Sequence, residues 1–317
     1  MSMTLVLRTA KGVERMLAKE VVKLTGLKSG VAIQADGEVW VEGGVCHLEL
    51  LKAKSRFVDR ISLKHEAASS LEEVKMIASE LQGRSVELIS RVPVLWTGRE
   101  IVSAVKAGAD FGGEGTIIAA TEVGNKVRLE RELYSRIPRK YKVTQRGWSL
   151  FSDEESSPAP LVERQPLTSV ISGFIEATRV LQMTSQIIFD PFCGDAKLAR
   201  ALASASFYGA GVSPHADLCD LEKSNLKLTQ KPFEQMLDFI TDPLLLTVVT
   251  KNREKSSSEN VHEKLRRLGA VCKHRTDFKG LWILSDDTRV KAWSGLRFEC
   301  MQEFGRWQVL RWLGRKM

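Results

Sequence analysis

The chain has 317 residues, which is enough for two or three domains with separate cores. Its 47 Lys and Arg exceed its 39 Asp and Glu, and the net charge of +8 favours an anionic partner such as RNA. Its 5 Cys and 5 His form no cluster and no Cys-x-x-Cys pair, which argues against a disulfide framework and predicts that no metal is bound.

The cysteine usage indicates a reducing, intracellular compartment. No apolar run reaches the roughly 20 residues needed to cross a bilayer. Residues 1–20 are basic enough to resemble a mitochondrial presequence, but 4–7 has the pattern of a strand and 13–24 that of a helix belonging to the fold. The expected location is therefore the cytoplasm or the mitochondrial matrix.

Residues 1–64 have the pattern of a small α+β domain. The expected elements, in chain order, are a strand at 4–8, a helix at 13–24, strands at 31–34 and 38–41, and a helix at 45–58. The segment Ala35-Asp36-Gly37 predicts the hairpin turn between the two middle strands, because Gly accepts the positive φ that such turns require. Strand, helix, hairpin and helix together predict a ferredoxin-like unit.

Residues 65–150 predict a second α+β module. We expect helices at 71–81 and 101–109, strands at 86–92 and 116–120, an extended segment at 126–133, and a closing strand within 140–151. Basic residues gather between 126 and 146 with Tyr134, Tyr141 and Trp148 among them. Cations contact phosphates and aromatic rings stack on unpaired bases, so this composition favours RNA contact over its alternative, a solvated charged face. The predicted RNA-binding residues are Arg136, Arg139, Lys140, Lys142 and Arg146.

A polar linker is expected at 151–165, followed by a third domain at 166–317. The apolar run 187–189 leads into Asp190, a turn containing Gly194, and a helical pattern from Leu198. In open α/β sheets ligands bind beyond the carboxyl ends of the strands, so this turn is the candidate binding loop. An Asp-Pro turn of this kind is also common as a purely structural feature.

Asp190-Pro191-Phe192-Cys193-Gly194-Asp195-Ala196 resembles the S-adenosylmethionine loop of the THUMP-containing RNA guanine-N2 methyltransferases, whose usual form is Asp-Pro-Phe/Met-Cys-Gly-Ser-Gly-Thr. The order of segments before and after it is similar to the same family over nearly the whole chain. The resemblance implies a THUMP module at 65–150 and a Rossmann-like methyltransferase domain that ends in a β-hairpin. It also implies that Asp190, Phe192, Cys193 and Gly194 hold the cofactor.

The chain departs from the family at three places. Ala196 replaces a Gly of the cofactor loop, and Gly211 stands where an acidic residue binds the ribose of the cofactor. In the family the catalytic Asn/Asp-Pro-Pro-Tyr/Phe motif ends the fourth strand, so the apolar run 237–240 is expected to be that strand. The motif is matched only by Asp242 and Pro243, which Leu244 and Leu245 follow; an ordinary turn after a strand is the alternative interpretation. Each lost contact costs about a kcal/mol or more, so together the departures argue against efficient catalysis and favour weakened or lost binding of S-adenosylmethionine.

The tail predicts a helix at 261–268, a buried strand at 280–284 and a hairpin over 294–311 that turns near Gly305. Its last residues, 306–317, are basic and contain Trp307 and Trp312. They form either a second RNA patch or part of the sheet's packing.

Two functions follow from the resemblance. The first is an RNA-binding protein acting on rRNA or tRNA, with a ribosome-assembly or RNA-processing role, whose methyltransferase domain is atypical or inactive. The second is an active S-adenosylmethionine-dependent guanine-N2 methyltransferase, in which Asp242 accepts a hydrogen bond from the guanine amine. The three departures favour the first.

Overall fold

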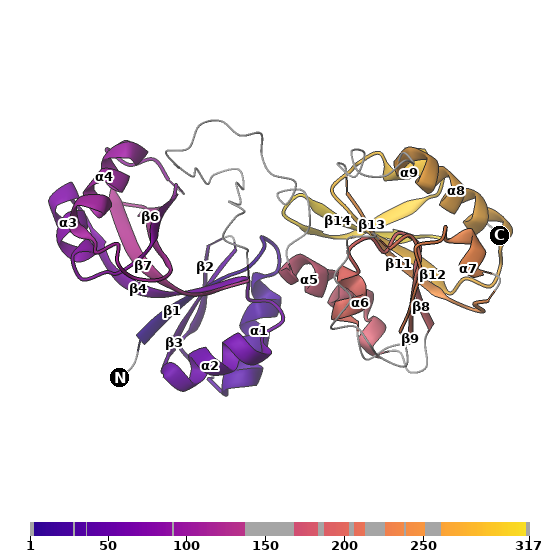
Figure 1. Ribbon diagram of the computed structural model, residues 1–317, viewed down its shortest axis with the longest axis horizontal. Coiled ribbons are helices and arrows are strands. Elements are labelled where there is room, and N and C mark those ends of the chain that lie inside the picture. The colour runs from indigo at the N-terminus through magenta and orange to yellow at the C-terminus, as the bar shows by residue number, and fades with distance from the viewer. Residues whose placement is uncertain are drawn as a thin grey trace. The chain divides into compact units, whose positions relative to one another are not determined.

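The structure, a computed structural model, describes residues 3–27, 29–35, 37–90, 92–136, 168–182, 187–202, 206–212, 226–237, 239–250 and 261–314. The chain divides into two compact units (Figure 1). Unit 1 comprises Met1–Glu163 and Leu167–Ser169, and unit 2 comprises Arg164–Pro166 and Val170–Met317. The described strands of each unit form one sheet.

Unit 1 alternates strands and helices. Its described elements are β1 (Met3–Arg8), α1 (Glu14–Thr25), β2 (Val31–Ala35), β3 (Glu38–Gly43), α2 (Val45–Lys54), β4 (Arg60–Ala68), α3 (Leu71–Ala78), β5 (Ser85–Ile89), α4 (Gly98–Gly108), β6 (Thr116–Glu122) and β7 (Lys126–Ser135). The strand order is β2-β3-β1-β4-β7-β6-β5, and only β5 and β6 are parallel.

The predicted hairpin at 35–37 is confirmed as the turn between β2 and β3. Gly37 has a φ of 76°, and a Cβ there would lie 2.7 Å from the carbonyl oxygen of Thr9. Only glycine fits this position without strain.

One long strand, β4, had no counterpart among the predicted elements. It pairs with β1 on one side and with β7 on the other, so it joins the two halves of the sheet. The predicted domain boundary at residue 64 lies inside this strand. The alternation in Arg60–Leu63 breaks off at the polar run Lys64–Glu66, where the β4–β7 register shifts at a bulge, and this explains why the strand pattern was missed.

The two faces of β7 differ in chemistry. Val127 and Leu129 join the apolar cluster that α3 and α4 build over one face of the sheet. Successive residues of a strand point to opposite faces, so Arg128 and Glu130 lie on the other face. Both are buried there, with exposures of 1% and 0%.

Unit 2 is a mostly parallel α/β domain. Its described elements are α5 (Thr168–Thr178, which begins in the part assigned to unit 1), β8 (Ile187–Asp190), α6 (Lys197–Ala201), β9 (Ser206–Gly209), β10 (Leu226–Leu228), α7 (Glu234–Leu237), β11 (Leu244–Val249), α8 (Val261–His274), β12 (Gly280–Ser285), α9 (Val290–Ser294), β13 (Phe298–Phe304) and β14 (Trp307–Trp312).

The strand order in unit 2 is β10-β9-β8-β11-β12-β14-β13, with β14 antiparallel to both of its neighbours. From β8 the chain proceeds outward to β9 and β10, then returns to β11 on the other side of β8. This reversal is a topological switch point, the place where open α/β sheets form a ligand crevice.

The centre of this sheet is β11. All of its residues are buried, as expected of a central parallel strand, and Leu245 and Val249 belong to the core that α7 and α8 cover. The predicted C-terminal hairpin is confirmed, with its turn at Gly305–Arg306. Trp307 is 5% exposed, so this residue packs within the unit and is not part of an RNA-binding surface.

Candidate functional site

The loop after β8 is held by its own backbone. The Oδ1 of Asp190 accepts a hydrogen bond from the N–H of Phe192 at 3.0 Å, and Asp190 is only 2% exposed. This is the turn that Asp commonly forms with the residue two places on. Asp190 therefore shapes the loop.

The same loop extends the pairing of β8 with β9. The N–H of Cys193 donates to the carbonyl of Ala210 at 2.9 Å, and that of Gly194 to the carbonyl of Gly211 at 3.3 Å. The thiol of buried Cys193 packs against Gly209, where a Cβ would lie 2.7 Å from its Sγ. Cys193 thus has a packing role in this loop.

Ala196 has an unusual backbone conformation. It precedes α6 with a φ of 57° and a ψ of 27°, in the left-handed region that glycine adopts most easily, and it is fully buried. Gly194 has a φ of 53°. The loop therefore keeps a glycine-type path while carrying a methyl group at residue 196.

A crevice of about 150 Å³ opens at the carboxyl ends of the strands. Pro191 and Phe192 from the β8 loop, Gly211 after β9, Phe233 before α7 and the end of β11 at Val248–Thr250 line it. The structure thus brings Phe192 and Gly211 together in one cavity. Asp190, Cys193 and Gly194 lie in the adjoining loop and are not among the lining residues.

Aromatic and basic side chains face each other across this crevice. The rings of Phe192 and Phe233 meet edge to face with their centroids 5.7 Å apart. Lys264 and Arg267, one turn apart on α8, line the opposite wall. The guanidinium of Arg267 lies 5.8 Å from the Phe233 ring centroid and donates through Nε to Glu234 at 2.7 Å.

The whole chain matches solved structures of methylases. One is a predicted N6-adenine-specific DNA methylase from Listeria monocytogenes, with 14% identity, a TM-score of 0.64 and coverage of 99% of this chain and 97% of that one. Another is TrmN from Thermus thermophilus, with 16% identity, a TM-score of 0.62 and coverage of 99% and 100%. A third, a protein assigned as a methyltransferase and complexed with SAH, has 13% identity, a TM-score of 0.58 and coverage of 100% and 99%.

The described parts of this chain share their fold with these proteins. At these identities the comparison establishes the fold alone. No protein-family model matches the sequence, and no curated protein sequence matches it significantly. The described residues contain no group of acidic, His and Cys side chains that could hold a metal ion. None of the described helices is long and apolar enough for a membrane span.

The placement of Asp242 and Pro243 after a strand is wrong. Both residues come before β11, and parallel strands end at the same edge, so they lie at the edge opposite the crevice. Asp242 is exposed, has a φ of 52° and approaches Lys279 at 3.8 Å. The error arose because the apolar run at 237–240 was interpreted as the fourth strand, whereas it lies at the end of α7 and in the following turn; β11 is the continuous run that comes next.

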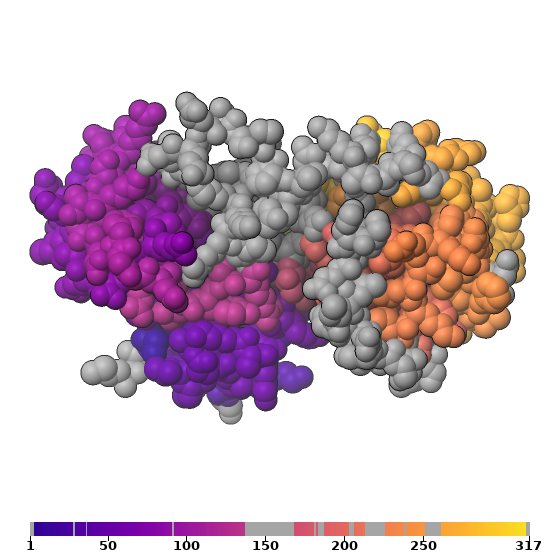
Figure 2. All heavy atoms as spheres, in the orientation of Figure 1, coloured from indigo at the N-terminus to yellow at the C-terminus, as the bar shows by residue number. Residues whose placement is uncertain are grey.

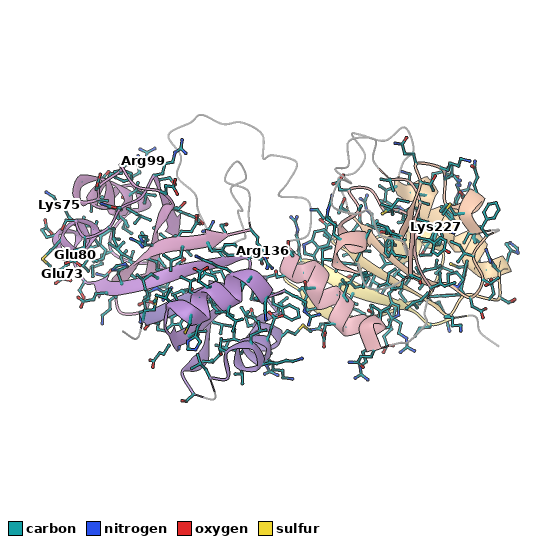
Figure 3. All side chains as sticks on the ribbon, turned by 60° about the horizontal axis from the view of Figure 1, so that its bottom comes forward. Glu73, Lys75, Glu80, Arg99, Arg136 and Lys227 are labelled. Atoms are coloured by element: carbon teal, nitrogen blue, oxygen red, sulfur yellow. The ribbon has the colours of Figure 1, made fainter. Side chains whose placement is uncertain are left out.

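Of the predicted RNA-binding residues, only Arg136 is described. Its Nε donates to the hydroxyl of Tyr134 at 2.9 Å, and its guanidinium also binds the carbonyl of Ser55. Arg136 lies just past β7, at the other end of unit 1 from Lys75 and Arg99 (Figure 3). Arg139, Lys140, Lys142 and Arg146 lie outside the described residues.

Two groups of charged residues were missed from the sequence. One is the crevice pair Lys264 and Arg267, whose signal is a basic helix that follows the central strand of a parallel sheet. The other is a buried cluster in unit 1, in which Arg8 donates to both carboxylate oxygens of Glu130 at 2.6 and 2.7 Å. Arg128 joins Glu130 at 2.9 Å and Glu38 at 3.0 Å.

The buried cluster shifts the titration of its members. Burial acts to raise the pKa of Glu130, but Arg8 and Arg128 outweigh it and hold that pKa below the usual value of 4.5. In the sequence, the part of this cluster that lies on β7 is visible as an alternation of charged and apolar residues. That alternation is also the pattern of a half-exposed strand, which is why the charged residues were not expected to be buried.

Proposed function

We propose that this chain binds structured RNA, such as rRNA or tRNA, through its N-terminal part, and that its methyltransferase-fold unit does not transfer methyl groups efficiently. In this proposal residues 1–64 form a ferredoxin-like module and residues 65–150 a THUMP-like module. The full-length likeness to methylases and the net charge of +8 support it. A role in ribosome assembly and a location in the cytoplasm or the mitochondrial matrix stay predictions from the sequence.

The state of the cofactor loop carries the proposal that methyl transfer is inefficient. The resemblance brings a glycine backbone against the cofactor at residue 196, but this chain has a buried methyl group there. At Gly211, where the family has an acid, a Cβ would meet the carbonyl oxygen of Pro191 at 3.9 Å and no other atom of the described residues within 4 Å. Gly211 itself thus supplies no carboxylate at that place, and the two departures together support the proposal of weakened S-adenosylmethionine binding.

The RNA-binding half is tested by salt titration. We expect the full chain to bind a structured RNA with an affinity that falls as salt rises, because phosphate contacts release counterions. Changing Arg139, Lys140 and Lys142 together to Ala should lower the slope of log affinity against log salt by about two. Fluorescence anisotropy with labelled RNA measures both quantities.

The control for this triple variant removes the same number of positive charges from helix α1. Arg15, Lys19 and Lys23 are exposed on α1 and carry the same charge as the tested residues. Their joint change to Ala should leave most of the slope intact. Equal effects of the two triple variants would contradict the assignment of RNA contact to residues 136–146.

An active S-adenosylmethionine-dependent RNA methyltransferase is the second candidate. The meeting of Phe192 and Gly211 in a crevice at the switch point favours it. Transfer of labelled methyl from S-adenosylmethionine to RNA by the wild-type chain, lost when Phe192 is changed to Ala, would establish this candidate in place of the first.

A further inference from the structure

The crevice of unit 2 has room for one planar ring. Its volume is about 150 Å³, and an apolar cavity of that size accommodates a benzene molecule. Phe192, Phe233 and Val249 supply apolar surface, and Gln230 adds an amide that can donate and accept hydrogen bonds. A flat ring with polar edges, such as a nucleobase, matches this lining. Figure 2 shows that residues 226–250, orange on its bar, reach the surface of unit 2.

The charge on the opposite wall selects an anion. Lys264 and Arg267 are i and i+3 on α8, so both side chains project from one side of the helix into the crevice wall. Val261, where α8 begins, lines the same cavity, and the positive end of a helix dipole favours negative charge. Glu234 neutralises part of this charge through Arg267, and Lys264 adds a second cation to the same wall.

The packing of the Arg267 guanidinium is a second reason to expect an anionic ligand in this crevice. Arg267 lies over the Phe233 ring and holds Glu234, so its position is fixed from two sides before any ligand arrives. A positioned Arg beside a Lys is the arrangement that binds phosphate oxygens well. S-adenosylmethionine has a net positive charge from its sulfonium and ammonium groups and is repelled by the same pair.

We propose that this crevice binds a nucleoside phosphate, with its base against Phe192 and Phe233 and its phosphate on Lys264 and Arg267. The ligand is either a free nucleotide or a nucleotide of bound RNA, and the RNA source rests on the proposed function. The unit thus keeps the ligand crevice of its fold but is selective for an anionic ligand.

The test titrates the full chain with AMP, adenosine, inorganic phosphate and S-adenosylmethionine in separate experiments at low salt, followed by calorimetry. AMP should bind about tenfold more tightly than adenosine, because hydrogen bonds to charged groups add to base stacking, and S-adenosylmethionine should give no binding heat at millimolar concentration. Phosphate alone should bind more weakly than AMP. Tighter binding of S-adenosylmethionine than of AMP, or equal binding of AMP and phosphate, would overturn the proposal.

A pair of variants on α8 locates the site. Lys264→Glu should weaken AMP about tenfold or more, since it replaces the attraction by repulsion. Arg266→Glu is the control: it makes the same change of charge two residues along, but the Arg266 side chain is 64% exposed, binds Glu263 and does not line the crevice. It should change AMP affinity by about twofold at most. Equal effects, or no effect of Lys264→Glu, would overturn the site.

Competition between AMP and labelled RNA shows whether the ligand of the crevice is a free nucleotide or a nucleotide of bound RNA. It also tests the crevice separately from the proposed RNA binding. If AMP displaces labelled RNA from the wild-type chain and Lys264→Glu weakens RNA, the nucleotide belongs to RNA. If AMP binds through Lys264 without displacing RNA, the ligand is a free nucleotide. If the wild-type chain binds AMP but binds no structured RNA at any salt concentration, the proposed function is refuted and the assignment of the crevice is not affected.

Discussion

Arginine serves two different purposes in the two units. In unit 1 the side chains of Arg8 and Arg128 are 6% and 1% exposed and are surrounded by the carboxylates of Glu38 and Glu130. In unit 2 Arg267 keeps 33% of its side-chain surface exposed and lines a crevice beside aromatic rings. Because Arg8 and Arg128 are buried among acids, their role is structural. Arg267 is partly exposed beside an apolar cavity, so its guanidinium can contact a ligand.

The buried cluster also explains why unit 1 has one continuous sheet. Its members come from β1, β3 and β7, which lie on both sides of β4. Removing one member leaves the others charged and desolvated. The comparison therefore predicts large stability effects in unit 1 and mainly binding effects at the crevice of unit 2.

The largest effect is expected for Glu130→Ala. It leaves Arg8 and Arg128 buried without one of the two carboxylates that they share, which should destabilise unit 1 by about 3–5 kcal/mol. Urea denaturation of the full chain, followed by a probe in each unit, measures the loss. The transition of unit 2 serves as the internal control and should not move. A loss below about 1 kcal/mol would show that the cluster is not a structural one.

Acid should reproduce part of that loss in the wild-type chain. The pKa of Glu130 is depressed in the folded state, so the carboxylate contributes stability that is present above its unfolded pKa near 4.5 and is lost as pH falls through the lower folded value. This loss should begin as the pH falls below about 4.5 and be complete below the folded pKa of Glu130, whereas Asp59, whose pKa burial raises to about 6, titrates at higher pH in the wild-type chain and in the variant alike. Glu130→Gln should show a flatter acid dependence, and an unchanged acid limb in this variant would contradict the assignment.

A smaller effect is expected for Gly269→Ala in unit 2. A Cβ at this position would lie 1.8 Å from the carbonyl oxygen of Ser294, so α8 would have to move away from α9. Overpacking of this kind costs about 1–3 kcal/mol. Ala270→Ser, an exposed neighbour on the same helix, is the control and should cost about 0.5 kcal/mol. Equal unfolding midpoints for the two variants would mean that the helices do not pack at Gly269.

The smallest effect concerns Asp242. Because its φ is 52°, Asp242→Gly relieves a left-handed conformation and should raise the stability of unit 2 by about 0.5–1 kcal/mol. The ion pair it loses with Lys279 is exposed and weak. RNA binding and any methyl transfer should stay unchanged, since the residue lies at the edge away from the crevice. A drop in either activity would restore Asp242 as a functional residue.

Much of the local structure could be predicted, because its signals are local. The strand, turn and helix around Asp190–Gly194 and the hairpin at Gly37 are confirmed, since turn residues and apolar periods lie within a few positions of one another. What could not be predicted depends on distant partners. The strand β4 is defined by its pairing with β1 and β7, and residues 237–240 have an apolar pattern that fits a strand or a short helix equally well.

The resemblance pointed to one side of the crevice but not to its opposite wall. Phe192 and Gly211, two positions that it marked, line the crevice, and their role in binding stays a prediction. Lys264 and Arg267 come from a helix more than fifty residues further on, and only the sheet order brings them to the same cavity. The buried pairing of Arg8 with Glu130 likewise joins residues 122 positions apart, for which the sequence contains no local signal.

Calorimetric titration of the wild-type full chain with S-adenosylmethionine asks whether unit 2 still binds the cofactor of its fold. We expect no binding heat at millimolar S-adenosylmethionine, under conditions in which AMP gives a saturable isotherm. Micromolar binding of S-adenosylmethionine that Phe192→Ala abolishes, with Arg266→Glu as the unaffected control, would contradict this expectation.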